Sequence, residues 1–327
     1  MTVLLCAATI ADCATIALAR KYPLRASIRN AVSFDVDPAG GQIVVADHDG
    51  PAILWFNANG DLAHTYAKHG TSLCQMGAPR AVAFARHDVV IYDSTRHHLL
   101  QFESDGSCAA DDVLPEWESP NGVIGAKGDT LYVAGDDAAS GDCVFFSIDL
   151  RHPTHVRTCF WSLADQRLII LFARQYLTVG ADSVIYADPY EAVVRESKHG
   201  QPATSIILSG LDIPQYSIPA NDIAIRSNRK LFFEFYNGKK VLEGVAAVTG
   251  GFVAVTRTPV NGKNRIDLDY YARGASVPSA TASFTTDAVT GVYPLSVRGD
   301  GKGSAYLLIA HGSWPAPQYE VYVYEVR

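Results

Sequence analysis

One pattern of short strands and turns recurs along the chain, and this recurrence constrains the fold more than any other sequence feature. Four segments align with one another: VSFDVDPAGGQIVVADHDGPAILWFNANGD, VAFARHDVVIYDSTRHHLLQFESDG, VIGAKGDTLYVAGDDAASGDCVFFSIDL and LTVGADSVIYADPYEAVVRESKHG. Each begins with a short apolar strand and a turn, continues with a β-branched and aromatic run, and then carries a strand of alternating character. Units of four strands at a period of roughly 40–50 residues are typical of a β-propeller.

Six such units fit the chain. The first strand of each unit is predicted to begin near Ala31, Ala81, Gly122, Tyr176, Gly244 and Pro294. Between the fourth and fifth units, about residues 210–242, lie two strand-like runs, Ile223 to Arg226 and Leu231 to Tyr236, which we interpret as an inserted hairpin. The segment also fits part of a seventh unit. The prediction is an all-β, six-bladed β-propeller of four-stranded antiparallel blades, with seven blades as the alternative.

The two ends of the chain are predicted to meet. The third strand of the last unit, Glu320 to Val326, ends the chain, so this blade needs a fourth strand from elsewhere. The segment Ala14 to Arg20 alternates suitably, and we expect it to pair there, because a closed ring leaves no unpaired edge. A single propeller domain then spans residues 14–327, which we expect to be a monomer. Residues 1–13 are interpreted either as an ordinary or disordered start or as the remnant of a signal peptide.

Composition narrows the class of partner. Of the 327 residues only 19% are charged, which fits stacked blades that bury both faces of their sheets. The net charge of -7 and the pI near 5.8 exclude a general nucleic-acid binder, whose surface would be basic. No stretch of sequence approaches the roughly 20 apolar residues that a transmembrane helix needs. The expected partner is therefore a protein or a small-molecule ligand.

The six cysteines bear on the compartment of the protein. An even count suits an oxidising environment, and Cys143 and Cys159 lie in predicted neighbouring strands where a disulfide is geometrically plausible. Cys74 and Cys108 flank the second unit, and for every cysteine a free buried thiol is the competing interpretation. We expect a periplasmic or secreted protein, with a cytoplasmic one as the alternative.

The repeats resemble those of the NHL type, in which an apolar strand and a Gly turn precede Tyr-Val-Ala-Asp and a strand ending in Phe. The most similar stretches are IVVADHDGPAILWFNANGD, VIYDSTRHHLLQFESDG and TLYVAGDDAASGDCVFFSID, so the resemblance covers about residues 30–150. It implies membership of the TolB-like, six-bladed propeller superfamily, which includes gluconolactonase-like and strictosidine-synthase-like proteins. Members range from binding modules to calcium-dependent hydrolases, so the fold does not transfer a function.

The gluconolactonase-like relatives imply a test for calcium. Their site uses one Glu and three Asn or Asp side chains at the channel, including the Asn of a Pro-Asn-Gly turn, and this chain has Pro120-Asn121-Gly122. By this resemblance Asn30, Asn121 and Glu243 are the candidate Ca2+ ligands. Arg80 and Gln175 occupy places where that family needs acidic or amide groups. A calcium-dependent lactonase or esterase is therefore the alternative function rather than the main one.

The main hypothesis is a binding or scaffold propeller that recognises its ligand through one face of the ring. The candidate binding residues precede or begin the first strands and are expected at the channel rim: Asn30, Arg80, Asn121, Gln175, Glu243 and Tyr293. We assign no catalytic residue and expect no cofactor. The loop histidines His48, His69 and His311 are further binding candidates. The recurring Asp47, Asp93 and Asp188 are interpreted as turn-stabilising carboxylates.

Overall fold

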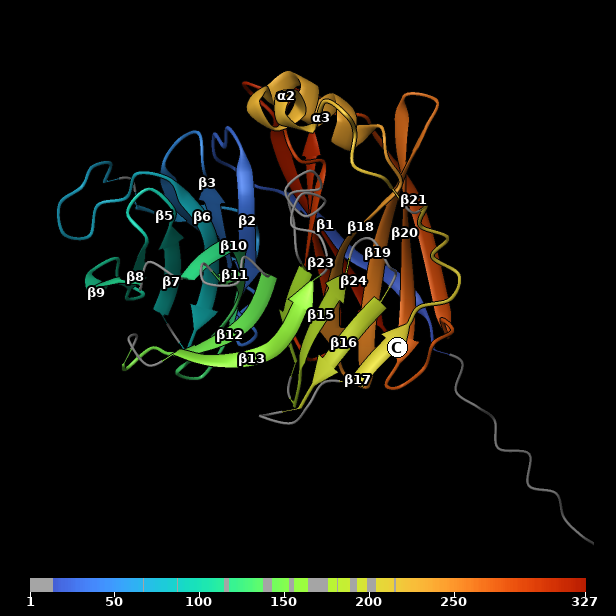
Figure 1. Ribbon diagram of the computed structural model, residues 1–327, viewed down its shortest axis with the longest axis horizontal. Helices are drawn as coiled ribbons and strands as arrows, with labels where there is room; N and C mark the ends of the chain where they lie inside the picture. Colours follow the sequence, from blue (N-terminus) through green and yellow to red (C-terminus); the bar gives the residue numbers. More distant parts are fainter. Residues whose placement is uncertain are drawn as a thin grey trace, which may run out of the picture.

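The described strands form six four-stranded antiparallel sheets arranged as the blades of a propeller (Figure 1). The computed structural model describes residues 14–66, 68–86, 88–114, 118–137, 143–152, 156–163, 176–180, 182–188, 193–198, 204–214 and 216–327. Each of the first five blades is built from four strands that are consecutive in the sequence. The prediction of an all-β, six-bladed propeller is therefore confirmed.

The bounds of the strands follow the predicted units. Blade 1 consists of β2 (Ala31–Val36), β3 (Ile43–Asp47), β4 (Ala52–Phe56) and β5 (Leu62–Tyr66). Blade 2 consists of β6 (Pro79–Ala85), β7 (Asp88–Asp93), β8 (His98–Phe102) and β9 (Cys108–Val113). Blade 3 consists of β10 (Glu118–Lys127), β11 (Thr130–Asp137), β12 (Cys143–Asp149) and β13 (Val156–Leu163). Blade 4 consists of β14 (Tyr176–Val179), β15 (Val184–Asp188), β16 (Val193–Ser197) and β17 (Thr204–Ile207). Blade 5 consists of β18 (Val241–Val248), β19 (Gly251–Val260), β20 (Lys263–Ala272) and β21 (Ala280–Asp287).

The sixth blade closes the ring with both ends of the chain. It consists of β22 (Leu295–Gly299), β23 (Ser304–His311), β24 (Gln318–Val326) and, as its outermost strand, β1 (Ile16–Pro23). The antiparallel pairing of β1 with β24 runs from Ile16 opposite Val326 to Pro23 opposite Glu320. The predicted closing strand is thus confirmed, displaced by a few residues toward the C-terminus. Residues 1–13 lie outside the described part of the chain.

Successive side chains of one strand enter different cores. In β3, Ile43 and Val45 pack in the core that blade 1 shares with blade 6, whereas Val44 and Ala46 pack in the core shared with blade 2. Because neighbouring side chains of a strand point to opposite faces, both faces of this sheet are apolar and buried. Packing of this kind explains why few residues of the chain are charged.

The segment between blades 4 and 5 is helical, and the prediction of an inserted hairpin was wrong. It contains α2 (Asp222–Ser227) and α3 (Arg229–Asn237). The residue pattern in Ile223 to Arg226 and in the aromatic run Leu231 to Tyr236 also fits a strand period of two, which is why the sequence predicts a hairpin. The side chain of Asn228 instead accepts a hydrogen bond from the backbone N–H of Leu231 (3.1 Å), and this N-cap starts α3. Phe233 and Tyr236, three residues apart, then fall on one buried helix face.

The structure contains a disulfide between Cys74 and Cys108, which joins the 68–77 loop to β9. Cys143 and Cys159 do lie in adjacent strands, as expected, but the register places Cys143 opposite Leu163 and Cys159 opposite Phe145. The side chains of Cys143 and Cys159 are outside the described part of the chain, so their pairing stays a prediction. No helix within the described ranges is long and apolar enough to cross a membrane.

Candidate functional site

Three of the predicted rim residues, Asn30, Glu243 and Tyr293, lie at the face of the ring that carries α2 and α3, which we call the upper face (top of Figure 1). In an antiparallel blade, the start of the first strand and the loop between the second and third strands lie at the same end. Asp47 fixes these two places to each other in blade 1. Its carboxylate accepts hydrogen bonds from the backbone N–H groups of Arg29 (3.0 Å), Asn30 (2.9 Å) and Gly50 (3.3 Å).

Asp93 repeats this arrangement in blade 2. It accepts from the backbone N–H groups of Gly77 (2.6 Å), Ala78 (3.1 Å) and Thr95 (2.9 Å). Both carboxylates are almost completely buried. The interpretation of Asp47 and Asp93 as turn-stabilising groups is therefore confirmed, while the side chain of Asp188 lies outside the described part of the chain.

Glu243 is a structural anchor rather than an open rim residue. Its side chain is 0% exposed, and its carboxylate accepts hydrogen bonds from the Arg257 Nε and from the Tyr236 hydroxyl (2.6 Å). Arg257, also 0% exposed, donates further to the carbonyl oxygens of Tyr236 (3.1 Å) and Asn237 (3.0 Å). Burial opposes the charge of Arg257, but the Glu243 carboxylate raises its pKa above the ordinary value. These bonds attach the end of α3 to blade 5.

Arg80 and Glu243 occupy corresponding places. The strand pairing skips Arg80 in β6, between Pro79 and Ala81, and it skips Glu243 in β18, between Leu242 and Gly244. Each is therefore the extra residue of a β-bulge. Arg80 is exposed, whereas Glu243 is covered by α3. In blade 1 the skipped residue is Val32, so Asn30 precedes the corresponding position by two residues.

The other predicted rim residues divide into two groups. Gln175 and the side chain of Asn121 lie outside the described part of the chain, although the backbone of Asn121 falls in a bulge of β10. Tyr293 is half-buried beneath α3, where its ring packs edge-on against those of Phe233 (5.1 Å) and Tyr236 (5.6 Å). Of the predicted set, Asn30 and Tyr293 thus lie beside the surface where α3 meets blades 1 and 6.

That surface holds a cleft in two parts, which we call the upper cleft. The apolar part, about 620 Å³, lies between α3 and the 289–291 loop and is lined by Phe233, Asn237, Val289 and Trp314 among others. The polar part, about 660 Å³, is lined by Arg29, His48, Asp49, Pro51, Arg229, Trp314 and Pro315. Both volumes fall in the range of roughly 300–1,000 Å³ that is common for ligand sites. Arg229 and Trp314 line both parts.

Asp49 organises the wall between the two parts of the cleft. Its carboxylate accepts from the Arg229 guanidinium (2.6 Å), the Trp314 indole N–H (3.0 Å) and the Asn30 amide (3.3 Å). The His48 Nδ1 lies 3.2 Å from the same carboxylate. Burial opposes ionisation, but the hydrogen bonds from His48 and Arg229 hold the pKa of Asp49 below its usual range. Three separate segments of the chain are therefore joined by one half-buried carboxylate.

Two aromatic rings lie close to the Arg229 guanidinium. It lies 5.1 Å from the centre of the Trp314 ring and 5.6 Å from that of Phe233, both suitable for cation–π attraction. Its remaining nitrogens donate to the carbonyl oxygen of Gly291 (3.0 and 2.7 Å). Sequence reasoning missed Arg229 and Trp314. The N-cap Asn228 was the available signal, since a helix starting there places Arg229 at its first position and Phe233 one turn later.

Of the candidate calcium ligands, Glu243 is not free to bind a cation, and the side chain of Asn121 lies outside the described part of the chain. The Arg257 guanidinium engages one carboxylate oxygen of Glu243 and the Tyr236 hydroxyl engages the other. Among the described residues, no three His, Cys, Asp or Glu side chains gather as a metal-binding group. Ca2+ prefers several free carboxylate and carbonyl oxygens that converge on one point. We therefore derive no calcium-dependent step from these residues.

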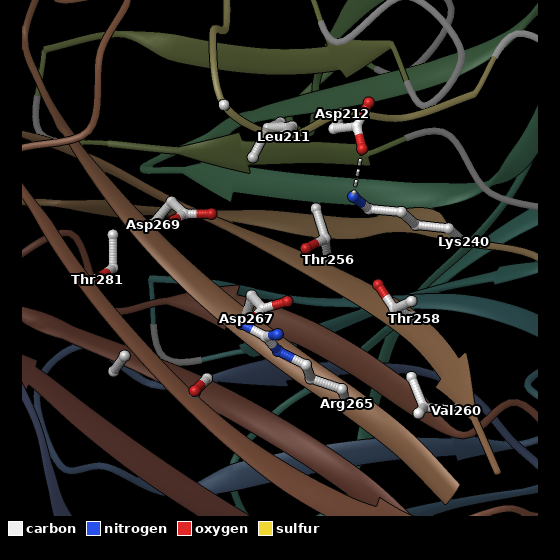
Figure 2. Close-up of a pocket in the computed structure, with 13 residues that line it drawn as sticks. Leu211, Asp212, Lys240, Thr256, Thr258, Val260, Arg265, Asp267, Asp269 and Thr281 are labelled. Carbon is white, nitrogen blue, oxygen red and sulfur yellow. Dashed lines mark hydrogen bonds and ion pairs between the residues drawn. The ribbon is translucent and has the colours of Figure 1, made fainter. Parts of the chain in front are cut away.

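A second cavity lies on blade 5 and differs in chemistry. Figure 2 shows this groove of about 560 Å³, where Lys240 and Asp212 face each other across its mouth at 3.8 Å. Asp267 and Asp269 line its floor beside threonine hydroxyls, and Arg265 pairs with Asp267 at 2.8 Å. Burial and the neighbouring Asp267 raise the pKa of Asp269 to about 6. The groove offers no aromatic ring, in contrast to the upper cleft.

Comparison with known proteins identifies the fold. No protein-family description and no curated protein matches the sequence. A member of the DUF4221 family from Bacteroides vulgatus is 8% identical, with a TM-score of 0.59 over 96% of this chain and 98% of that one. A Bacteroides fragilis protein described as a candidate exported protein is 11% identical, with a TM-score of 0.56 over 94% of each chain. A Bacteroides thetaiotaomicron protein of unknown function is 12% identical, with a TM-score of 0.51 over 95% and 76%. At such identities the likeness shows the fold alone.

Proposed function

We propose that this protein is a binding propeller of the NHL-like type and that its ligand occupies the upper cleft. The observation that carries the proposal is the Arg229 guanidinium, which lies close to the rings of Phe233 and Trp314 and is bonded to Asp49 where two cavities meet. A preorganised cation, an aromatic platform and an apolar cavity together are typical of a recognition site. The site is built on loops whose positions are fixed by a rigid ring.

The upper cleft replaces the channel rim as the main candidate surface. Arg80 keeps an exposed guanidinium and remains a candidate contact for a large partner, together with Asn121 and Gln175. Glu243 contributes indirectly, because its bonds to Arg257 and Tyr236 hold α3, and α3 supplies Arg229 and Phe233. A lactonase or esterase activity has no corresponding support from the residues proposed to bind calcium.

We further propose that the protein works in an oxidising compartment, the periplasm or the exterior of the cell. The Cys74–Cys108 disulfide supports this, because disulfides persist where thiols are not kept reduced. One protein of similar fold is itself described as a candidate exported protein. Fractionation of cells expressing the full chain tests the assignment. Recovery in the cytoplasmic fraction with both thiols free would contradict it.

The binding function is tested with a fragment library observed by ligand-detected NMR on the full chain. We expect fragments with an apolar ring to bind the wild type and to lose binding in Trp314→Ala. Ile207→Ala is the matched control, since Ile207 is 70% exposed on the outermost strand of blade 4. Fragments that bind Trp314→Ala as well as the wild type, or no binding fragment at all, would refute the cleft as a ligand site.

A further inference from the structure

A buried acceptor without a donor lies at the wall of the apolar part of the upper cleft. The Asn237 side chain donates through Nδ2 to the carbonyl oxygen of Val289 (2.9 Å), which fixes which end of the amide is the oxygen. Its Oδ1 is buried and has no hydrogen-bond partner among the described residues. Because a buried acceptor without a donor is costly, this position favours a ligand that brings an N–H or O–H group.

Asn30 repeats the feature beside the polar part. Its Nδ2 donates to Asp49 (3.3 Å), while its Oδ1 is buried and unpartnered within the described residues. Asn30 is only 6% exposed. Two buried amide oxygens near one cleft thus lack a hydrogen-bond donor. Carboxylate or carbonyl groups of a ligand cannot supply one, whereas amide N–H groups can.

The charges around the upper cleft favour an anion. Arg29, Arg229 and Lys230 line it against the carboxylates Asp49 and Glu234, although the whole chain has a net charge of -7. Asp49 is bonded to Arg229, and Glu234 lies 3.8 Å from Lys230. The guanidinium of Arg29, an exposed residue, enters no ion pair or hydrogen bond within the described part of the chain. A ligand carboxylate is the natural partner for this free cation.

We infer that the upper cleft binds the C-terminal end of a peptide whose last residue is hydrophobic. The hydrophobic side chain lies in the apolar part against Phe233 and Trp314, a backbone N–H donates to Asn237, and the terminal carboxylate pairs with Arg29. A peptide end combines these three groups within one residue, and capture of a terminal carboxylate is an established mode of peptide recognition. This inference rests on the proposed function, since it names the ligand class of the same site.

The test uses short synthetic peptides and the full chain, with binding measured by isothermal titration calorimetry. The probes are acetyl-Ala-Ala-Phe with a free carboxylate, its C-terminal amide, and the free acid with an N-methylated Phe. We expect the free acid to bind about tenfold more tightly than either altered peptide, the loss typical for one charge-assisted or buried hydrogen bond. Acetyl-Phe alone is the fourth probe, and we expect it to bind more weakly than the tripeptide.

Variants assign each preference to its residue. Arg29→Gln should remove the preference for the free acid over the amide, and Asn237→Ala should remove the preference for N–H over N-methyl. Lys302→Gln is the control, because Lys302 is an exposed lysine in the turn between β22 and β23 and lines neither part of the cleft. Trp314→Ala should abolish binding of every probe.

The outcomes separate the inference from the function on which it rests. No binding of any peptide at about 5 mM, with fragments that still require Trp314, would overturn the peptide class and leave the site standing. Equal binding of acid and amide, or an unchanged preference in Arg29→Gln, would overturn the role of the carboxylate. Acetyl-Phe binding as tightly as the tripeptide would point to a free acylated amino acid instead of a peptide end. If neither peptides nor fragments bind in a way that depends on Trp314, the upper cleft is not a ligand site and the proposed function fails as well.

Discussion

Two arginine–carboxylate pairs flank α3, and they differ in burial. The pair of Arg257 with Glu243 is 0% exposed on both sides and bonds the end of the helix to blade 5. The pair of Arg229 with Asp49 is 36% and 18% exposed and lines a cleft. A third pair, Arg298 with Asp35, lies between these extremes at 13% and 15% exposure in the narrow central channel. The same chemistry therefore serves attachment where it is buried, and in the proposed function it serves recognition where it is open.

Burial determines how much stability each pair loses when one partner is removed. In an intact buried pair, the cost of desolvating the two charges nearly cancels their attraction. A fully buried pair contributes little net stability, but removal of one partner leaves an uncompensated charge. An exposed pair contributes little in either case, so its residues are free to exchange partners with a ligand. The three pairs consequently predict a graded series of mutational effects.

The largest effect is expected from Arg257→Met, which leaves the Glu243 carboxylate buried with only the Tyr236 hydroxyl. We expect the free energy of unfolding to fall by about 3–5 kcal/mol. Arg229→Met is the matched control and should cost below about 1 kcal/mol. Urea denaturation of the variants measures both.

The double variant Arg257→Met/Glu243→Leu sharpens this test. It removes both charges, so we expect most of the lost stability to return. Equal losses in the Arg257 and Arg229 variants would break the comparison between the two pairs.

The intermediate pair predicts a dependence of stability on pH. Burial raises the pKa of Asp35 to about 6, against the opposing effects of Arg298 and the Phe84 N–H. A carboxyl whose pKa is higher in the folded chain stabilises the fold when protonated, so stability falls as pH rises from about 4 to about 6. Asp35→Asn should remove up to ~1–3 kcal/mol of this fall. Melting curves between pH 4 and 7 measure it, with Asp269→Asn as a second variant whose pKa is also about 6. An unchanged slope in Asp35→Asn would contradict the account.

A smaller effect is expected at the start of α3, which carries Arg229 of the open pair. Asn228→Ala removes the hydrogen bond to the Leu231 N–H, and loss of an N-cap typically costs about 1 kcal/mol. Amide hydrogen exchange within residues 229–237 should rise accordingly. Ser227→Ala is the control, since Ser227 donates to the Ile223 carbonyl and does not cap α3. Equal exchange in both variants would show that the cap does not hold the helix.

The smallest effect on stability is expected from Asp49→Asn. The pKa of Asp49 is lowered in the folded chain, so its contribution is present above the unfolded value near 3.9 and disappears as pH falls through the folded value. For this half-buried pair we expect a difference below about 1 kcal/mol at pH 7 and none in strong acid. Thermal melting at both pH values measures it. A difference that persists in strong acid would mean that packing, not charge, is the role of Asp49.

The sequence predicted the ring well because repetition averages over weak local signals. The strand period recurs in every blade, so an error at a single residue, such as Asn30 in place of the bulge residue Val32, does not disturb the architecture. The helical insertion occurs once, and its aromatic run fits both a strand and a helix period. Its N-cap at Asn228 was the deciding residue. The upper cleft could not be read from sequence because Asp49, Arg229 and Trp314 are far apart in the chain and meet only when the ring closes.

The most direct test of the upper cleft follows Trp314 itself. The chain has four tryptophans, so 5-fluorotryptophan labelling gives a small set of 19F resonances, and Trp314→Phe identifies the one of interest. During titration with acetyl-Ala-Ala-Phe free acid, we predict that the Trp314 resonance shifts with saturation while the others stay unchanged. A Trp314 resonance that does not move during the titration, whether or not calorimetry detects binding of the peptide, would contradict the central claim.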